Sequence, residues 1–237
     1  MAPSNTTNFN QVKGVYMLKV VLLSTAALAL AATTTDAFAA PADVALSKGG
    51  AMTVFQGKPV LKGLEKFTPP PKKSVIFSTL GSGNNYDGGE GWTVANPGAV
   101  GFQQWVAFAI TPTSNVTATE IAVAAGYVEG ANSFTVELLS DNGGVPGSVL
   151  EKKTVKNLQT FGDCCAVAVD KLKSGVALTA GTTYWVAEML PSKKQADTWD
   201  AWNLSSSNTN DGQAATNTGS GWGATELEYG AFAVYGK

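Results

Sequence analysis

From residue 74 onward, apolar residues recur at every second position, which is the period of a β-strand with one buried face. In residues 133–138, for example, Phe, Val and Leu alternate with Ser, Thr and Glu. Turn-forming residues separate these runs, as in residues 141–144. About nine such runs without a helical period predict an all-β fold, an antiparallel β-sandwich that is jelly-roll-like. A closed barrel has the same periodicity and is the alternative.

The N-terminal part of the chain has a different pattern. An apolar run covers residues 20–32, after Lys19 and before the segment Ala37, Phe38, Ala39. A basic start, an apolar middle and small residues at the end are typical of a signal peptide, and the run is shorter than the roughly 20 residues of a membrane-spanning helix. We therefore expect residues 1–39 to be an N-terminal extension and signal peptide, with Met1 or Met17 as the start. The product should be secreted or periplasmic, without a membrane span after cleavage.

Residues 40–73 are rich in Pro, Gly and Lys, and they include three consecutive prolines at positions 69–71. Consecutive prolines favour an extended backbone that acts as a stiff spacer. We expect this segment to be a mostly irregular linker, in which Val54 and Phe55 could form a short strand. The β-sandwich domain should then comprise residues 74–237.

Composition narrows the chemistry further. The chain has no histidine, and all 16 basic residues are lysine. A Ser-His-Asp or Cys-His nucleophile, a zinc site of the usual type and bidentate arginine clamps are therefore excluded. With a formal net charge of −2 and no basic block, we expect no nucleic-acid partner. The remaining candidates for general acid and base are paired carboxylates, Asp197 with Asp200 and Glu226 with Glu228. Such pairs also arise by chance in exposed loops, so we expect a protein that is not an enzyme.

Several segments in order resemble the choice-of-anchor R type domain of bacterial exported proteins, over about residues 74–237. The similar segments are residues 126–138, 141–150, 161–165, 178–185, 197–203 and 230–234. The resemblance implies an extracellular β-sandwich module, and it carries over no catalytic residue.

Tryptophans near polar side chains are the candidate ligand contacts: Trp92, Trp199, Asp200, Trp202, Asn203 and Trp222. An exposed Trp beside carboxylates or amides can stack on a sugar ring while the polar groups bind its hydroxyls. The alternative is that these rings fill the core under long loops. Trp105 is out of step with the apolar residues Val106 and Phe108, so it could lie on the outer face of its strand beside Gln103.

The polar loop at residues 81–91 is a candidate calcium site. Its possible ligands are Asn84, Asn85, Asp87 and Glu90. Calcium takes six to eight oxygen ligands, and glycines allow the backbone to wrap around the ion, but the spacing is not that of an EF-hand. The alternative is a hairpin tip rich in turn formers, and we expect no obligatory cofactor.

The two cysteines are neighbours, Cys164 and Cys165. Adjacent residues of a strand point to opposite faces, and their Cα atoms lie closer than in most disulfides. A strained vicinal disulfide, two free thiols and intermolecular links are all compatible with an oxidising compartment.

Together these features predict a secreted, non-catalytic β-sandwich module for extracellular binding or surface structure, with an unknown extracellular or surface ligand. A carbohydrate-binding or adhesin domain that uses exposed Trp is the first alternative. A carboxylate-based glycoside hydrolase is the second.

Overall fold

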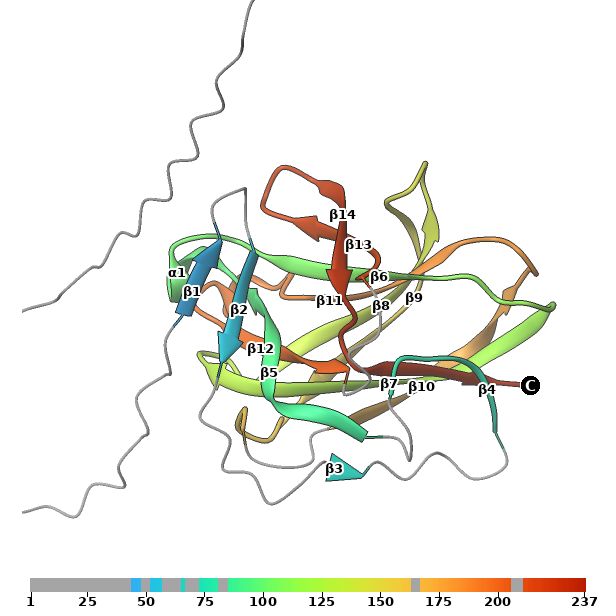
Figure 1. The fold of residues 1–237 in the computed structure, drawn as a ribbon, viewed down its shortest axis with the longest axis horizontal. Helices are drawn as coiled ribbons and strands as arrows, with labels where there is room; N and C mark the ends of the chain where they lie inside the picture. Colours follow the sequence, from blue (N-terminus) through green and yellow to red (C-terminus); the bar gives the residue numbers. More distant parts are fainter. Residues whose placement is uncertain are drawn as a thin grey trace, which may run out of the picture. The chain divides into compact units, whose positions relative to one another are not determined.

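The computed structural model describes residues 44–47, 52–56, 65–66, 73–80, 85–162, 167–205 and 211–237 (Figure 1). All of them belong to one compact unit, Ala40–Lys237. The predicted signal peptide and Cys164 and Cys165 lie outside the described residues. Among the described residues, no helix is long and apolar enough to cross a membrane.

Nine strands form the first sheet, in the order β1-β2-β5-β12-β7-β15-β4, with β3 also paired to β5 and β10 to β7. Their bounds are β1 Val44–Ser47, β2 Met52–Gln56, β3 Glu65–Lys66, β4 Ser74–Ser78, β5 Asn85–Ala95, β7 Val116–Glu129, β10 Val167–Leu178, β12 Trp199–Ser205 and β15 Phe232–Gly236.

Six strands form the second sheet, in the order β14-β13-β6-β11-β8-β9. Their bounds are β6 Trp105–Ile110, β8 Ser133–Asp141, β9 Pro146–Lys156, β11 Tyr184–Met189, β13 Asp211–Asn217 and β14 Trp222–Glu228. The described residues also include two short helices: α1 at Pro97–Val100 joins β5 to β6, and the 3₁₀-helix η1 at Lys193–Gln195 lies between β11 and β12.

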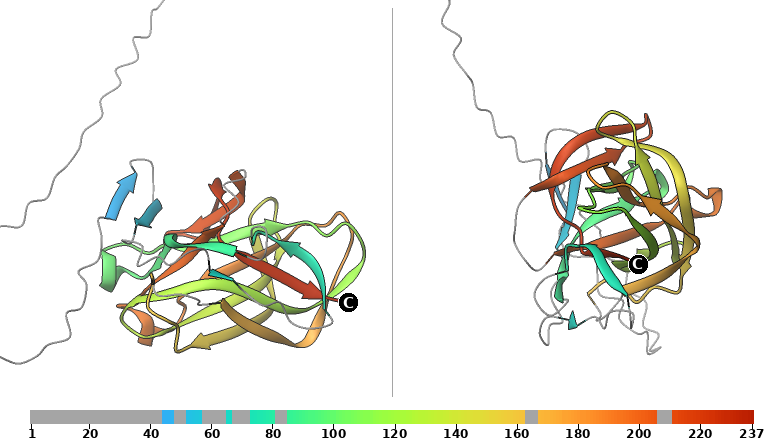
Figure 2. Two further views of the ribbon diagram at one scale, coloured as in Figure 1. Left: turned by 60° about the horizontal axis from the view of Figure 1, so that its bottom comes forward. Right: turned by 90° about the vertical axis from the view of Figure 1, so that its right-hand side faces the viewer.

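The chain crosses repeatedly from one sheet to the other, and all the strand pairs are antiparallel. The two sheets pack together as a sandwich (Figure 2). The prediction of an all-β antiparallel sandwich is therefore confirmed. Aromatic rings from both sheets meet in the core, where Phe108 of β6 lies edge-on to Trp202 of β12 at 5.0 Å between ring centroids.

The segment between residues 40 and 73, predicted to be a mostly irregular linker with a possible short strand at Val54 and Phe55, contains β1, β2 and β3, and β2 includes Val54 and Phe55. Strands β1 and β2 form a hairpin, and β2 pairs with β5 so that Phe55 lies opposite Gly91. The short strand β3 pairs with β5 farther along. Hydrogen bonding to the free edge of β5 explains the difference, because the backbone of an edge strand offers unpaired groups to any neighbouring extended segment.

Candidate functional site

The outer face of the second sheet carries two half-buried tryptophans. Trp105 of β6 and Trp222 of β14 lie on either side of Asn217 of β13, each in register with it. Residues opposite one another in antiparallel strands share a face, so the three side chains form one row, which we call the tryptophan row. The next residue of β6, Val106, is in the core between the sheets. The prediction that Trp105 points outward agrees with this placement.

Amide groups hold the tryptophan row in place. Gln103 donates from Nε2 to Oδ1 of Asn217 at 3.0 Å, and the same oxygen accepts the backbone N–H of Gly219 at 2.9 Å. The indole N–H of Trp105 donates to Oδ1 of Asn96 at 3.1 Å. Within the described residues, Nδ2 of Asn217 and Oε1 of Gln103 have no hydrogen-bond partner.

Small residues form the floor beside the row. Ala215, Ala107 and Ala187 lie side by side on β13, β6 and β11, and all three are fully buried. Trp105 and Trp222 pack against this alanine cluster. Because a methyl group rises little above a sheet, large rings can lie close to the backbone here.

The opposite end of the same face is closed. Trp185 of β11 is fully buried, and its indole N–H donates to Oδ1 of Asp141 at 2.8 Å. The turn after Asp141 contains Gly144, whose φ of 90° favours glycine. A Cβ atom on Gly144 would lie 3.7 Å from Nε2 of Gln213 on β13, so this turn reaches across β11 and β6. The outer face is therefore covered at Trp185 and accessible at the tryptophan row.

The other predicted tryptophan contacts lie in the interior. Trp92 is 7% exposed, Trp199 4% and Trp202 0%. The indole N–H groups of Trp92 and Trp202 donate to the carbonyls of Glu228 and Ala231, at 2.7 and 3.1 Å. The corner at Trp199 and Trp202 is thus part of the packed structure and not a surface platform, which is the alternative that the sequence left open.

A segment distant in sequence covers Trp199. This ring packs with Ala95 against residues of α1 and against Phe161. The backbone of Phe161 crosses β7 so closely that a Cβ atom on Gly126 would lie 2.6 Å from its Cα. Asn203 is also buried, and its Nδ2 donates to the carbonyl of Asp87 at 2.9 Å. Neither Trp199 nor Asn203 can therefore contact a ligand at the surface.

The predicted calcium loop is largely strand, because β5 begins at Asn85. The carboxylate of Asp87 accepts the backbone N–H groups of Gly89 and Glu90 at 2.7 and 3.1 Å, as in a local turn. Asn84 lies outside the described residues. Within the part of the chain that the structure describes, no three acidic, His or Cys side chains are grouped to hold a metal ion.

The predicted carboxylate pairs are placed differently from one another. Asp197 is exposed whereas Asp200 is fully buried, so these two do not share a site. Glu226 is exposed and Glu228 half-buried on β14, where they lie opposite Gln213 and Asp211.

Asp200 instead has a partner that sequence analysis missed. Asp200 lies opposite Val94, and Glu188 of β11 lies opposite Val106; both valines are in the core, so both carboxyl groups point between the sheets. Burial raises the pKa of Glu188 well above its ordinary value, and the nearby Asp200 raises it further. Burial also raises the pKa of Asp200 well above its ordinary range. The sequence feature that could have indicated this pair is the acidic Glu188 within the mostly apolar strand β11.

A third buried acid lies on the outer face. Glu137 of β8 is opposite Ala187 and, on its other side, opposite Lys152 of β9. Burial raises the pKa of Glu137, and the positive charge of Lys152 partly offsets this rise.

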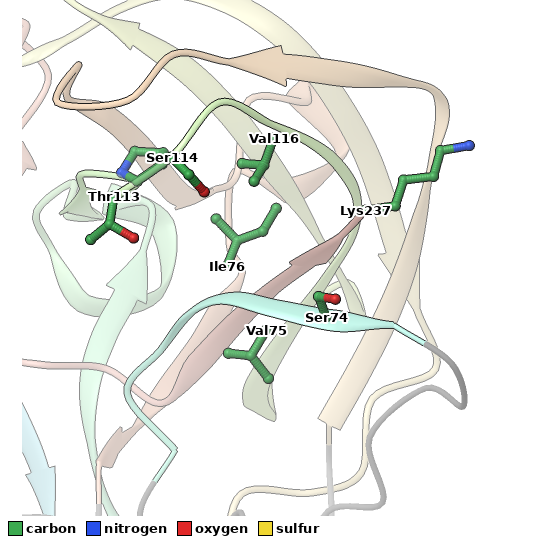
Figure 3. Close-up of a pocket in the computed structure, with 8 residues that line it drawn as sticks. Ser74, Val75, Ile76, Thr113, Ser114, Val116 and Lys237 are labelled. Carbon is green, nitrogen blue, oxygen red and sulfur yellow. The ribbon is translucent and has the colours of Figure 1, made fainter.

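A small cavity of about 260 Å³ lies beside β4 (Figure 3). Its lining includes Ile76 and Val116 together with the hydroxyl-bearing Ser74, Thr113 and Ser114, and it includes no acidic side chain. Ligand pockets usually have about 300–1,000 Å³, so this cavity is slightly smaller than most of them.

Comparison with protein-family models, curated proteins and solved structures finds no match to the chain.

Proposed function

We propose that this chain is a secreted, non-catalytic binding module, and that the tryptophan row binds a saccharide outside the cell. The observation that carries the proposal is the pair of half-buried rings, Trp105 and Trp222, in register on either side of Asn217. Neighbouring strands lie about 4.8 Å apart, so the two strands that carry the rings are roughly 10 Å apart. A short oligosaccharide laid across the strands can span this separation.

The chemistry of the row matches a sugar. The apolar face of a pyranose ring packs on an aromatic ring, while its hydroxyls need hydrogen-bonding groups nearby. Beside the rings, Asn217 offers an amide N–H group and Gln103 a side-chain carbonyl, neither of which has a partner among the described residues. Because neither amide carries charge, the row favours a neutral ligand.

The sequence supports an extracellular setting. The signal-peptide pattern of residues 1–39 and the low share of charged residues, 14%, are typical of exported β-domains. The resemblance to the choice-of-anchor R type domain implies the same setting and no catalytic activity.

A panel of neutral oligosaccharides and polysaccharides tests the proposal, with binding measured by calorimetry on the mature chain. We expect at least one saccharide to bind, and Trp105→Ala and Trp222→Ala each to weaken it at least about tenfold, or ~1.4 kcal/mol. Val149→Ala is the matched control, because Val149 is an exposed apolar residue of β9 in the same sheet. Binding that survives in the Trp105→Ala/Trp222→Ala double variant would place the site elsewhere. A panel without any binding would refute the saccharide class.

A further inference from the structure

The interior of the sandwich contains two acidic groups for which the described residues provide no compensating charge. Glu188 and Asp200 are both 0% exposed, and none of their four carboxyl oxygens has a hydrogen-bond partner among the described residues. They belong to opposite sheets, on β11 and β12. The two carboxyl groups are close enough for Asp200 to act electrostatically on Glu188.

Two buried carboxylates are costly unless something neutralises them. The effective penalty for burying an ion is several kcal/mol, and two like charges add their repulsion. The salt bridge seen among the described residues joins Lys73 and Glu120, not the buried pair. Amide or hydroxyl donors do not replace a cation here, because all four oxygens are unpartnered.

A third residue, Gln104, adds a fifth unpartnered oxygen near the two carboxyl groups. Gln104 is fully buried, and its Oε1 has no hydrogen-bond partner. Gln104 directly precedes β6 and lies two residues before Val106, the residue opposite Glu188, so it shares the inner face. Its backbone pairs with Ala95, the neighbour of Val94, which lies opposite Asp200. The side chain is fixed by a 2.8 Å hydrogen bond from Nε2 to the carbonyl of Thr93.

We propose that Glu188, Asp200 and Gln104 bind one Ca²⁺ ion between the sheets. All the available ligands are hard oxygens, which suit Ca²⁺ and Mg²⁺ and not the softer transition metals. Two bidentate carboxylates and one amide oxygen supply five of the six to eight ligands that Ca²⁺ takes, and its flexible geometry accepts water or carbonyl oxygens for the rest. The two negative charges balance the ion. This site is separate from the loop at residues 81–91.

The placement of the site predicts how the ion enters. Since both carboxyl groups are fully buried, Ca²⁺ must enter during folding or through a local opening. The chain between Glu188 and Asp200 is held in place by Asn96, whose Nδ2 donates to the carbonyls of Leu190 and Gln195 at 2.8 and 2.9 Å. The ion should therefore exchange slowly, and the experiment must include refolding.

The test uses the mature chain refolded either in CaCl₂ or in EDTA. We expect about one Ca²⁺ per chain by elemental analysis after dialysis. The melting temperature should be roughly 5–10 °C higher in Ca²⁺ at a hundredfold excess over Kd than in EDTA. Mg²⁺ at the same concentration should give a smaller rise, because it demands a stricter octahedral geometry.

Two variants distinguish Ca²⁺ binding at the buried site from Ca²⁺ binding by other acidic residues. The Glu188→Gln/Asp200→Asn double variant removes both charges with little change in shape, and it should fold in EDTA but no longer bind or respond to Ca²⁺. Glu137→Gln, which changes a buried acid on the outer face of the same sheet, should respond like the wild type. If the double variant does not fold, the Ca²⁺ content and the melting temperatures of the wild type and of Glu137→Gln still test whether the chain binds Ca²⁺.

One result would overturn the proposal: a wild type without bound Ca²⁺ and with equal melting temperatures in Ca²⁺ and EDTA. A shared proton would then neutralise the pair, and stability would fall as the pH rises.

Discussion

The two faces of the second sheet are built from the same strands but differ in what covers them. On β11, Val186 and Glu188 point into the sandwich, whereas Trp185 and Ala187 point to the outer face. The inner face is sealed by the opposite sheet. The outer face is covered at Trp185 but accessible at Trp105 and Trp222. Alternate residues of β11 therefore pack on opposite faces of the sheet, although all four are fully buried, and only the outer face continues to the half-buried Trp105 and Trp222.

The largest expected effect concerns a ring of the core. Trp202→Ala should lower the free energy of unfolding by about 3–5 kcal/mol, because it removes a fully buried ring that packs on Phe108 and Phe232. Urea unfolding followed by circular dichroism measures the change. Trp222→Ala should cost clearly less, since its ring is half-buried. Equal costs for the two variants would remove the distinction between the faces.

The next largest effect on stability is expected in the alanine cluster. Ala187→Leu should destabilise the protein by about 1–3 kcal/mol, because the added atoms have no space on the covered part of the outer face. Ala224→Leu is the matched control: Ala224 lies opposite Ala215 on the same face but is exposed, so its change should stay within about 0.5 kcal/mol. A neutral Ala187→Leu would mean that the face is not packed there.

The smallest expected effect concerns the acid on the outer face. Lys152→Met removes the charge that lowers the pKa of Glu137, so that pKa should rise further above its ordinary value of 4.5. A raised pKa means that stability is greatest below the ordinary value and is lost as the pH rises through the folded-state pKa. The variant should therefore lose more stability than the wild type above pH 4.5. Nuclear magnetic resonance titration of Glu137 measures the pKa.

A matched control for this titration is Lys153→Met. Lys153 is the next residue of β9, but it lies opposite Val136 and not opposite Glu137. Its removal should leave the pKa of Glu137 unchanged. The same rise in both variants would show a general charge effect and not a cross-strand one.

The strands and the outward direction of Trp105 could be predicted because both depend on period-two alternation within one segment. For Trp199 the sequence left both burial and a ligand contact open and could not decide between them, because Phe161 covers the ring from a segment distant in sequence. The meeting of Glu188 and Asp200 was equally hidden, since it depends on how two sheets face each other. Pairing of β2 with β5 depends on a free strand edge, which no local pattern in residues 40–73 reveals.

The most direct test of the binding face follows the indole N–H signals of the tryptophans during titration with a bound saccharide, using nitrogen-15 labelled protein. We predict that the signals of Trp105 and Trp222 shift, while those of Trp185 and Trp202 stay in place because their rings are buried. Saturable binding that leaves the signals of Trp105 and Trp222 unchanged would contradict it.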